Sequence, residues 1–211
     1  MPDPNSFFGS RPAFHVEGLE EPVLAASLIG LVISETLGEP SRCEATFNNW
    51  VDGALVYPDD RTLAFARPLE IRLGEEVLFA GHIVALEGRF PAARPPELRA
   101  IAAGLVHAPE EHASAIQLVH GAALRELHVT IERGAAQRVV RDEVVRRQAR
   151  DATTARGIAV PTRGLRVGAR VEVEGVGPSF GGEYHVTETR HLFDHSQGLR
   201  IEFVATRATH P

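Results

Sequence analysis

The sequence predicts a mostly β protein, built of two small antiparallel β-barrel or split-barrel units with one helix. Three observations lead to this prediction. Several segments alternate apolar and polar residues with a period of two, which is typical of strands that bury one face. Glycine and proline are frequent, with 19 and 14 residues, and they divide these segments into short runs. Residues 135–151 form the best candidate for an amphipathic helix.

The clearest strands lie near the carboxyl end, where three of them follow one another through short turns. They span residues 167–175, 183–193 and 199–207, and polar turns rich in glycine separate them. In the first strand, valines and an alanine occupy one face, while arginine and glutamate occupy the other. Short connections favour an antiparallel meander, because parallel strands need long crossovers.

The amino-terminal part contains further strand candidates with intervening turns. Cys43 shares one face of its strand with Ala45 and Phe47, which predicts a small, buried apolar side chain. The expected strands span residues 25–36, 41–48, 68–73, 77–86, 97–106 and 116–133, the last as either a strand pair or one long bent strand.

The helix candidate at residues 135–151 has a narrow apolar stripe that includes Ala136, Val140 and Val144. Five arginines occupy much of the remaining surface of this helix. Because Asp142 and Glu143 interleave with them, we interpret this surface as a solvated face and not as a nucleic-acid contact.

Composition excludes several classes of function. The net charge is -6, and every one of the 22 basic residues is arginine, so neither a Schiff-base lysine nor a P-loop lysine exists. The absence of a basic block argues against a nucleic-acid partner. With Cys43 alone, no intramolecular disulfide forms. The sequence has no apolar run of the roughly 20 residues that a membrane segment needs, and its start does not resemble a signal peptide.

One motif suggests catalysis, namely the G-x-S-x-G pattern of residues 177–181 around Ser179. It matches the nucleophile elbow of α/β-hydrolases, and Asp194 and His195 follow in the order that this fold uses. The elbow requires a strand, a tight turn and then a helix, whereas this turn leads into a segment with strand composition. We therefore predict no catalytic residues.

Histidines are the other candidates for chemistry. On a regular strand His185 and His191 point to the same face about 20 Å apart, too far for one metal ion. We interpret His191 as a strand-end histidine with a hydrogen-bond partner and His195 as a turn residue. The sequence therefore predicts no metal site and no cofactor.

The segment at residues 180–194, F-G-G-E-Y-H-V-T-E-T-R-H-L-F-D, with Gly198 and Phe203 after it, resembles the end of the phage late control D family. The family pattern there is F-S-G-x-Y-x-V-T-x-x-x-H, and this chain has Gly181 where serine is usual. These are tail-hub proteins related to the hub part of VgrG in contractile injection systems. An earlier region, with Leu78 to Gly81, Ile83 and Leu98 as landmarks, is similar to the first barrel of the same family.

The resemblance covers about two-thirds of the chain and thins after His107, which implies a shortened hub without the family's middle domain. The expected domains are a first hub-type barrel with an N-terminal arm over residues 1–112, connecting strands over 113–134, and a helix with a second hub-type barrel over 135–211.

The resemblance implies a structural baseplate hub protein and not an enzyme. Such a protein forms a homotrimer that joins the tail tube protein to the spike protein and contacts other baseplate proteins. We expect synthesis in the cytoplasm and incorporation into a phage tail-like particle. The interface candidates are Phe7 and Phe8 in the arm, which could equally dock on this chain's own core, and Trp50 at a strand end. The alternatives are a β-barrel ligand-binding module and a serine hydrolase using Ser179.

Overall fold

A computed structural model describes residues 11–57, 62–105, 115–132 and 152–208. These residues form fifteen strands and one short helix, and thirteen of the strands belong to a single sheet. The prediction of a mostly β fold is therefore confirmed. The expected helix at residues 135–151 and the arm residues Phe7 and Phe8 lie outside the described residues. No helix in the described ranges is long and apolar enough to span a membrane.

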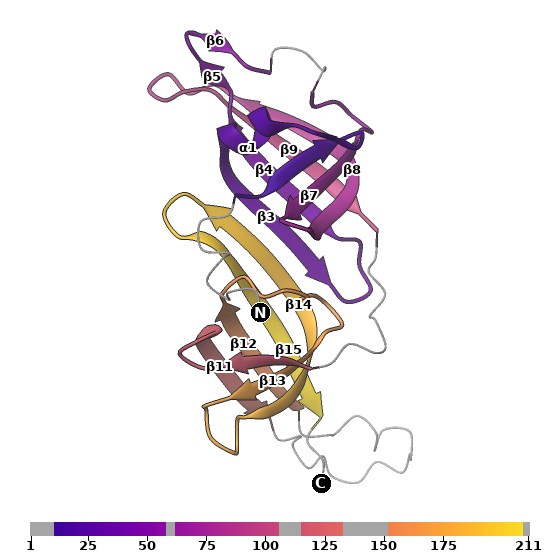
Figure 1. The fold of residues 1–211 in the computed structure, drawn as a ribbon, viewed down its shortest axis with the longest axis vertical. Helices are drawn as coiled ribbons and strands as arrows, with labels where there is room; N and C mark the ends of the chain where they lie inside the picture. Colours follow the sequence, from indigo (N-terminus) through magenta and orange to yellow (C-terminus); the bar gives the residue numbers. More distant parts are fainter. Residues whose placement is uncertain (1–10, 58–61, 106–114, 133–151, 209–211) are drawn as a thin grey trace, which may run out of the picture.

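The molecule is elongated, with two halves arranged along its long axis (Figure 1). The elements of the first half are β1 (Ala13–Val16), β2 (Leu19–Glu20), α1 (Pro22–Ser27), β3 (Leu28–Thr36), β4 (Arg42–Asn48), β5 (Trp50–Val51), β6 (Ala54–Leu55), β7 (Pro68–Leu73), β8 (Glu76–Arg89) and β9 (Glu97–Gly104). Those of the second half are β10 (Ile116–Val119), β11 (Leu124–Glu132), β12 (Ala152–Ala159), β13 (Arg170–Glu174), β14 (Gly182–Asp194) and β15 (Gly198–Ala208).

In the first half, the strands are hydrogen-bonded in the order β3, β4, β9, β8, β7, β1 and β2, and they curl around one apolar core. The alternation read from β4 is confirmed, because Cys43, Ala45 and Phe47 are all buried. The short helix α1 contacts β1 and β4 and places Leu24 in the core.

The helix α1 occupies residues where the sequence predicted the start of a strand. The expected strand at residues 25–36 begins only at Leu28, and the three residues before it are helical. Pro22 lies in the first helical turn, where its missing N–H costs no hydrogen bond and its fixed φ suits the helix. Burial of Leu24 in the core then stabilises this short helix. This is a tertiary effect, which the strand-like composition of the segment does not reveal.

In the second half, the order is β10, β13, β14, β15, β12 and β11, around a separate apolar core. The antiparallel meander of β13, β14 and β15 is confirmed. Its first strand is shorter than predicted, because the chain still turns at Val167 and Gly168 and the strand spans only Arg170–Glu174. The segment at residues 116–133 forms two strands, but no ladder joins them. Instead, β10 pairs with β13 in parallel, an exception to the antiparallel rule.

The strand β14 connects the two halves. Its first residues pair with β13 in the second half, and Glu188–Asp194 pair with β3 of the first half. The hairpin of β14 and β15, yellow-orange in Figure 1, extends from the lower half alongside β3. Phe193 and Leu199 near its turn pack in the first core, while Ile201 and Phe203 pack in the second.

Closed barrels are not found in the described parts of the chain. The path of paired strands runs from β2 to β11, with β13 and β10 branching from β14, and no ladder joins any two of the described edge strands β2, β10 and β11. Of the expected barrel or split-barrel units, the closed barrel is thus corrected: one continuous sheet curls around two separate cores. The long β14 is the physical reason, because this one strand pairs with strands of both halves and leaves no break between them.

Candidate assembly surface and buried junction

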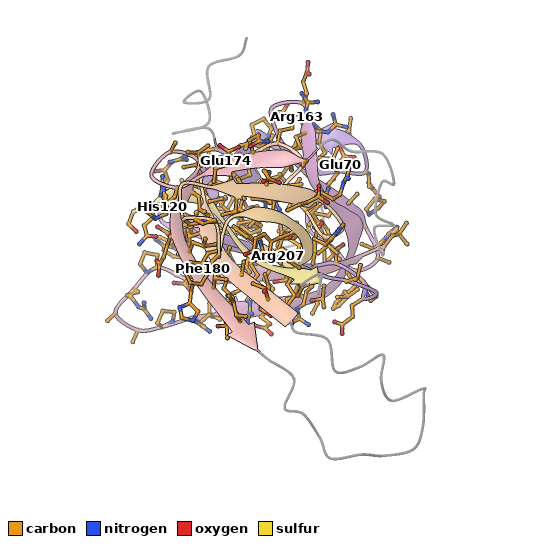
Figure 2. The ribbon with its side chains drawn as sticks, turned by 90° about the horizontal axis from the view of Figure 1, so that it is seen from below. Glu70, His120, Arg163, Glu174, Phe180 and Arg207 are labelled. Atoms are coloured by element: carbon orange, nitrogen blue, oxygen red, sulfur yellow. The ribbon has the colours of Figure 1, made fainter. Side chains whose placement is uncertain are left out.

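The G-x-S-x-G segment forms a surface turn at one end of the molecule. Two side chains of the adjoining strands fix its backbone. Arg207 on β15 donates hydrogen bonds to the carbonyls of Gly181 and Ser179, and the Tyr184 hydroxyl donates to the carbonyl of Phe180 at 2.6 Å. Figure 2, seen from below, shows Phe180 and Arg207 close to each other at this end. All three bonds are made to backbone carbonyls of the turn, and none of them involves the Ser179 hydroxyl.

The remaining members of the hydrolase motif lie at the other end of β14. Ser179 comes before this strand, whereas Asp194 ends it and His195 follows in the turn. Twelve residue steps of strand separate the two ends, on the order of 40 Å. The Asp194 carboxylate accepts hydrogen bonds from Ser196, Gln197 and Arg200, which lower its pKa from the ordinary value. The structure thus does not bring a serine, histidine and aspartate together here.

A β-bulge changes the prediction for the histidines. The register of β14 against β15 shifts between Val186 and Glu188, so the buried face changes from even-numbered to odd-numbered residues. His185 therefore faces outward and His191 inward, and the expectation that both share one face is wrong. No group of three or more histidine, cysteine or carboxylate residues in the described ranges could hold a metal ion.

The largest departure from the sequence prediction is His191 itself. Its side chain is 1% exposed, and neither ring nitrogen has a hydrogen-bond partner. The interpretation of His191 as a strand-end histidine with a partner is therefore wrong. Burial lowers its pKa to about 4, an effect that the nearby charge of Glu35 opposes and that of Arg166 reinforces.

His191 lies beside three polar residues, Glu35, Arg166 and Thr189. We call these four residues the junction cluster. Arg166 comes from the loop between β12 and β13 and forms a buried ion pair with Glu35 on β3. It also donates hydrogen bonds to the carbonyls of Val77 (2.8 Å) and Leu78 (3.0 Å) on β8. This single guanidinium thus connects a loop of the second half to two strands of the first.

The other oxygen of the Glu35 carboxylate is also occupied. It accepts hydrogen bonds from the Thr189 hydroxyl at 3.1 Å and from the backbone N–H of Val167 at 3.4 Å. Burial by itself raises the pKa of Glu35, but the hydrogen bonds and the charge of Arg166 outweigh it, and the pKa lies below its ordinary value. The carboxylate is therefore held ionised between the two apolar cores.

Exposed apolar residues lie at the end of the molecule formed by β5 and β6. These strands form a hairpin whose turn, Asp52 and Gly53, has positive φ at both positions, as tight hairpin turns require. The hairpin carries Trp50, Val51 and Leu55, which are between 38% and 49% exposed. It projects at the top of the molecule in Figure 1. Trp50 is the one interface candidate from the sequence that the described residues include, and its role stays a prediction.

Two edge strands of the sheet, β2 and β11, differ in how they present their backbone. The edge strand β2 has two residues and leads directly into Pro22 and α1. The edge strand β11 has nine residues without proline, and among the described residues it pairs only with β12. A long regular edge is a suitable place for another strand to add, whereas a short edge next to a helix is protected.

A shallow hollow of about 480 Å³ lies on the outer face of β3, β4, β8, β9 and the β14–β15 hairpin. Its charged side chains pair with one another, as Arg99 does with Glu44 and Glu87, and Arg200 with Asp194. Phe193, its one aromatic lining residue, is 7% exposed. This lining lacks the aromatic patch that a carbohydrate- or peptide-binding barrel would use.

The sequence did not identify the junction cluster as a unit. Glu35 and Arg166 are separated by 131 positions, and each lies in a segment where charged residues alternate with apolar ones. The one local signal is that Glu35 and Thr189 lie on the buried faces of their strands. For Thr189 this can be recognised only when the bulge in β14 is known.

No protein-family model matches the sequence, and no curated protein matches it either. Solved structures do match. A tail protein from Neisseria meningitidis MC58 aligns with a TM-score of 0.65 at 8% identity, covering 93% of this chain and 96% of that one. The 43 kDa tail protein of prophage MuSo2 from Shewanella oneidensis aligns with a TM-score of 0.61 at 8% identity, with the same coverages.

A third match is the c3393 protein of Escherichia coli, with a TM-score of 0.58 and 11% identity, covering 91% of this chain and 76% of that one. That protein is described as a component of the type VI secretion system with structural similarity to the T4 bacteriophage tail proteins gp27 and gp5. Over more than nine-tenths of its length, this chain therefore has the fold of phage tail proteins and of a tail-like component of the type VI secretion system.

Proposed function

We propose that this chain is a structural component of a phage tail-like particle, namely a baseplate hub protein that joins the tail tube to the spike. The observation that carries the proposal is the match in fold to two phage tail proteins over 93% of the chain. The local sequence resemblance at residues 180–194 to the late control D family points to the hub in particular.

The architecture supports a trimeric ring. Each chain has two curled halves, each with its own apolar core, connected by the shared strand β14. Three copies would present six such halves, a number suited to meeting a six-fold tube on one side and a three-fold spike on the other. The long open edge of β11 and the apolar hairpin at Trp50 are the surfaces that we assign to contacts with neighbouring subunits or tail proteins.

The proposed role is not enzymatic. A serine hydrolase using Ser179 would need the serine beside a histidine and an aspartate, but Ser179 lies at the opposite end of β14 from Asp194 and His195. A ligand-binding module would need an aromatic patch, and the hollow on the outer face of the sheet does not have one. Neither alternative has a specific observation in its favour. Assembly partners are therefore the tail tube protein, the spike protein and other baseplate proteins, and the place of action is the particle.

The experiment is a measurement of mass for the full chain by native mass spectrometry and light scattering, alone and with the tail tube and spike proteins encoded with it. A homotrimer has a mass of about 69 kDa, three times the 22.9 kDa of the chain. Binding of that trimer to tube or spike protein is the expected result. A chain that stays monomeric at high concentration and binds neither protein would overturn the proposal.

A matched pair of variants locates the contact. Trp50→Ser removes the aromatic ring from the β5–β6 hairpin, and Phe65→Ser removes an exposed ring elsewhere on the surface. If the hairpin is a contact, the first variant weakens assembly and the second leaves it unchanged. If both variants change assembly equally, the hairpin is not part of the interface. The proposed hub function is then tested by the mass measurement alone.

A further inference from the structure

Three features connect the two halves of the molecule. The first is the ladder between β14 and β3, and the second is the tip of the β14–β15 hairpin, whose Phe193 and Leu199 reach the first core. The third is the loop at residues 163–168, which contacts the first half through polar groups. Arg166 binds Glu35 and two carbonyls of β8, and the Gly164 N–H donates to Glu76 at 2.9 Å. Charge and hydrogen bonding thus hold this third connection.

We infer that the junction cluster is an acid-operated hinge: protonation of His191 releases the loop at residues 163–168 from β3 and β8 while both apolar cores stay folded. The inference concerns the contact between the halves and does not depend on the proposed function.

The surroundings of His191 have no place for a second proton. In the sheet its neighbours are Ile33 on β3 and Ile201 on β15, and along its own strand Thr189 and Phe193 share its face. A protonated imidazole has two N–H donors and requires two acceptors. Both ring nitrogens are buried without a partner, so the charged ring would have to leave this position or draw water into it.

The nearby carboxylate does not supply the missing acceptor. One oxygen of Glu35 accepts two hydrogen bonds from Arg166, and the other accepts from Thr189 and Val167. A carboxylate has about four lone-pair sites, and these four bonds fill them. To pair with Glu35, the imidazolium would displace one of these partners, and displacing Arg166 or Val167 detaches the loop.

Other titratable groups near His191 or the loop include Cys43, Glu35 and Glu76. On β4, in the next row of the sheet beyond Ile33, the Cys43 thiol stays protonated because burial raises its pKa. The inner face of β15 is apolar, and β8 contacts the loop through the carbonyls that accept from Arg166 and through the Glu76 carboxylate that accepts from Gly164. The pKa of Glu35 lies below its ordinary value, because its hydrogen bonds and the charge of Arg166 outweigh the effect of burial. Among these groups, His191 is the one whose charged form would lack hydrogen-bond partners in the closed junction.

The direction of the effect follows from linkage. The pKa of His191 is about 4 in the closed junction, against 6.5 for a solvated histidine. Between these two values the open junction binds a proton that the closed one does not, so acid favours opening. The full difference corresponds to a rise of up to about 300-fold in the opening equilibrium, of which about half is reached at pH 4 and the rest below it.

The test is amide hydrogen exchange of the full chain by mass spectrometry between pH 7.5 and pH 4, corrected for the intrinsic rate. The backbone amides of Gly164 and Val167 report on the junction, since they donate hydrogen bonds to Glu76 and Glu35 of the first half in the closed state. Ala45 on β4 and Val171 on β13 report on the two cores. We expect the junction amides to lose protection across this range by up to two orders of magnitude while the core amides keep theirs.

Two variants separate His191 from general acid effects. His191→Leu removes the titrating group, so its junction amides keep their protection down to about pH 4. His185→Gln changes an exposed histidine on the same strand and keeps the wild-type profile. If the leucine variant does not fold, His191→Gln serves in its place, and the order in which the wild-type amides lose protection remains a test by itself. Simultaneous loss at junction and cores, or an unchanged profile in the His191 variant, would overturn the inference.

Discussion

The two halves of the molecule enclose their cores in different ways. Within the described residues, twenty buried apolar side chains form the first core and twelve the second. Aromatic rings stack edge to face in the first, where Phe14 and Phe47 lie 5.3 Å apart and Phe47 and Tyr57 lie 6.1 Å apart. The second core consists mainly of valine, alanine and leucine around Tyr184 and Phe203.

The two halves also differ in the elements next to their edge strands. In the first half, α1 packs against β1 and β4 and buries Leu24 completely. In the second half, a turn at residues 120–123 connects the edge strands β10 and β11, and Leu127 and Val129 on β11 are only partly buried. We therefore expect the second half to be the less self-sufficient one, with more of its stability coming from its contact with the first half. Four predictions test this difference.

The largest effect is expected where the halves meet. Arg166→Met keeps most of the side-chain volume but leaves the buried Glu35 carboxylate without its cation. The free energy of unfolding should fall by about 3–5 kcal/mol, because an uncompensated buried charge is costly. Urea unfolding followed by circular dichroism measures this change. Adding Glu35→Gln should restore at least half of the loss, and a double variant as unstable as the single one would contradict the explanation.

A matched pair of leucines compares the halves directly. Leu24 in the first core and Leu118 in the second are both fully buried, so alanine at either position should cost about 2–5 kcal/mol. We expect Leu118→Ala to unfold the second half at lower urea, before fluorescence of Trp50 in the first half changes. Leu24→Ala should shift the fluorescence transition instead. A single coincident transition in both variants would mean that the halves unfold as one unit.

A smaller effect is expected at the turn that begins β14. Tyr184→Phe removes the hydrogen bond from the hydroxyl to the Phe180 carbonyl and should cost about 1 kcal/mol. Hydrogen exchange at Gly181, whose N–H bonds to the Gly177 carbonyl at 2.8 Å, should increase while the first half is unaffected. Unchanged exchange at Gly181 would show that Arg207 alone fixes the turn.

The smallest change in stability is expected at the β5–β6 hairpin. Trp50 is 42% exposed, and Trp50→Ser should change the free energy of unfolding by no more than about 0.5 kcal/mol. Unfolding by circular dichroism measures this value. A loss above 2 kcal/mol would identify Trp50 as a residue that stabilises the first half and would remove the reason to consider its exposure an assembly feature.

Local patterns predicted the strands whose two faces differ in polarity. In β15, Leu199, Ile201, Phe203 and Ala205 are buried as predicted, and the polar turn before it lies where predicted. The same patterns missed β12, because Thr153 and Ala155 are small or polar although both are fully buried. Gly157 lies within that strand for a tertiary reason: a Cβ there would lie 2.7 Å from the ring of Phe203.

The sequence by itself determined the β class, the positions of most strands and the final hairpin, because the two-residue period and the turn residues act over a few positions. Only the tertiary structure decided that β14 serves both halves, that a bulge near Thr187 turns His191 inward, and that Glu35 meets Arg166. These outcomes depend on which distant strands pair and in which register. A period of two specifies which face is buried but not the partner against which it is buried.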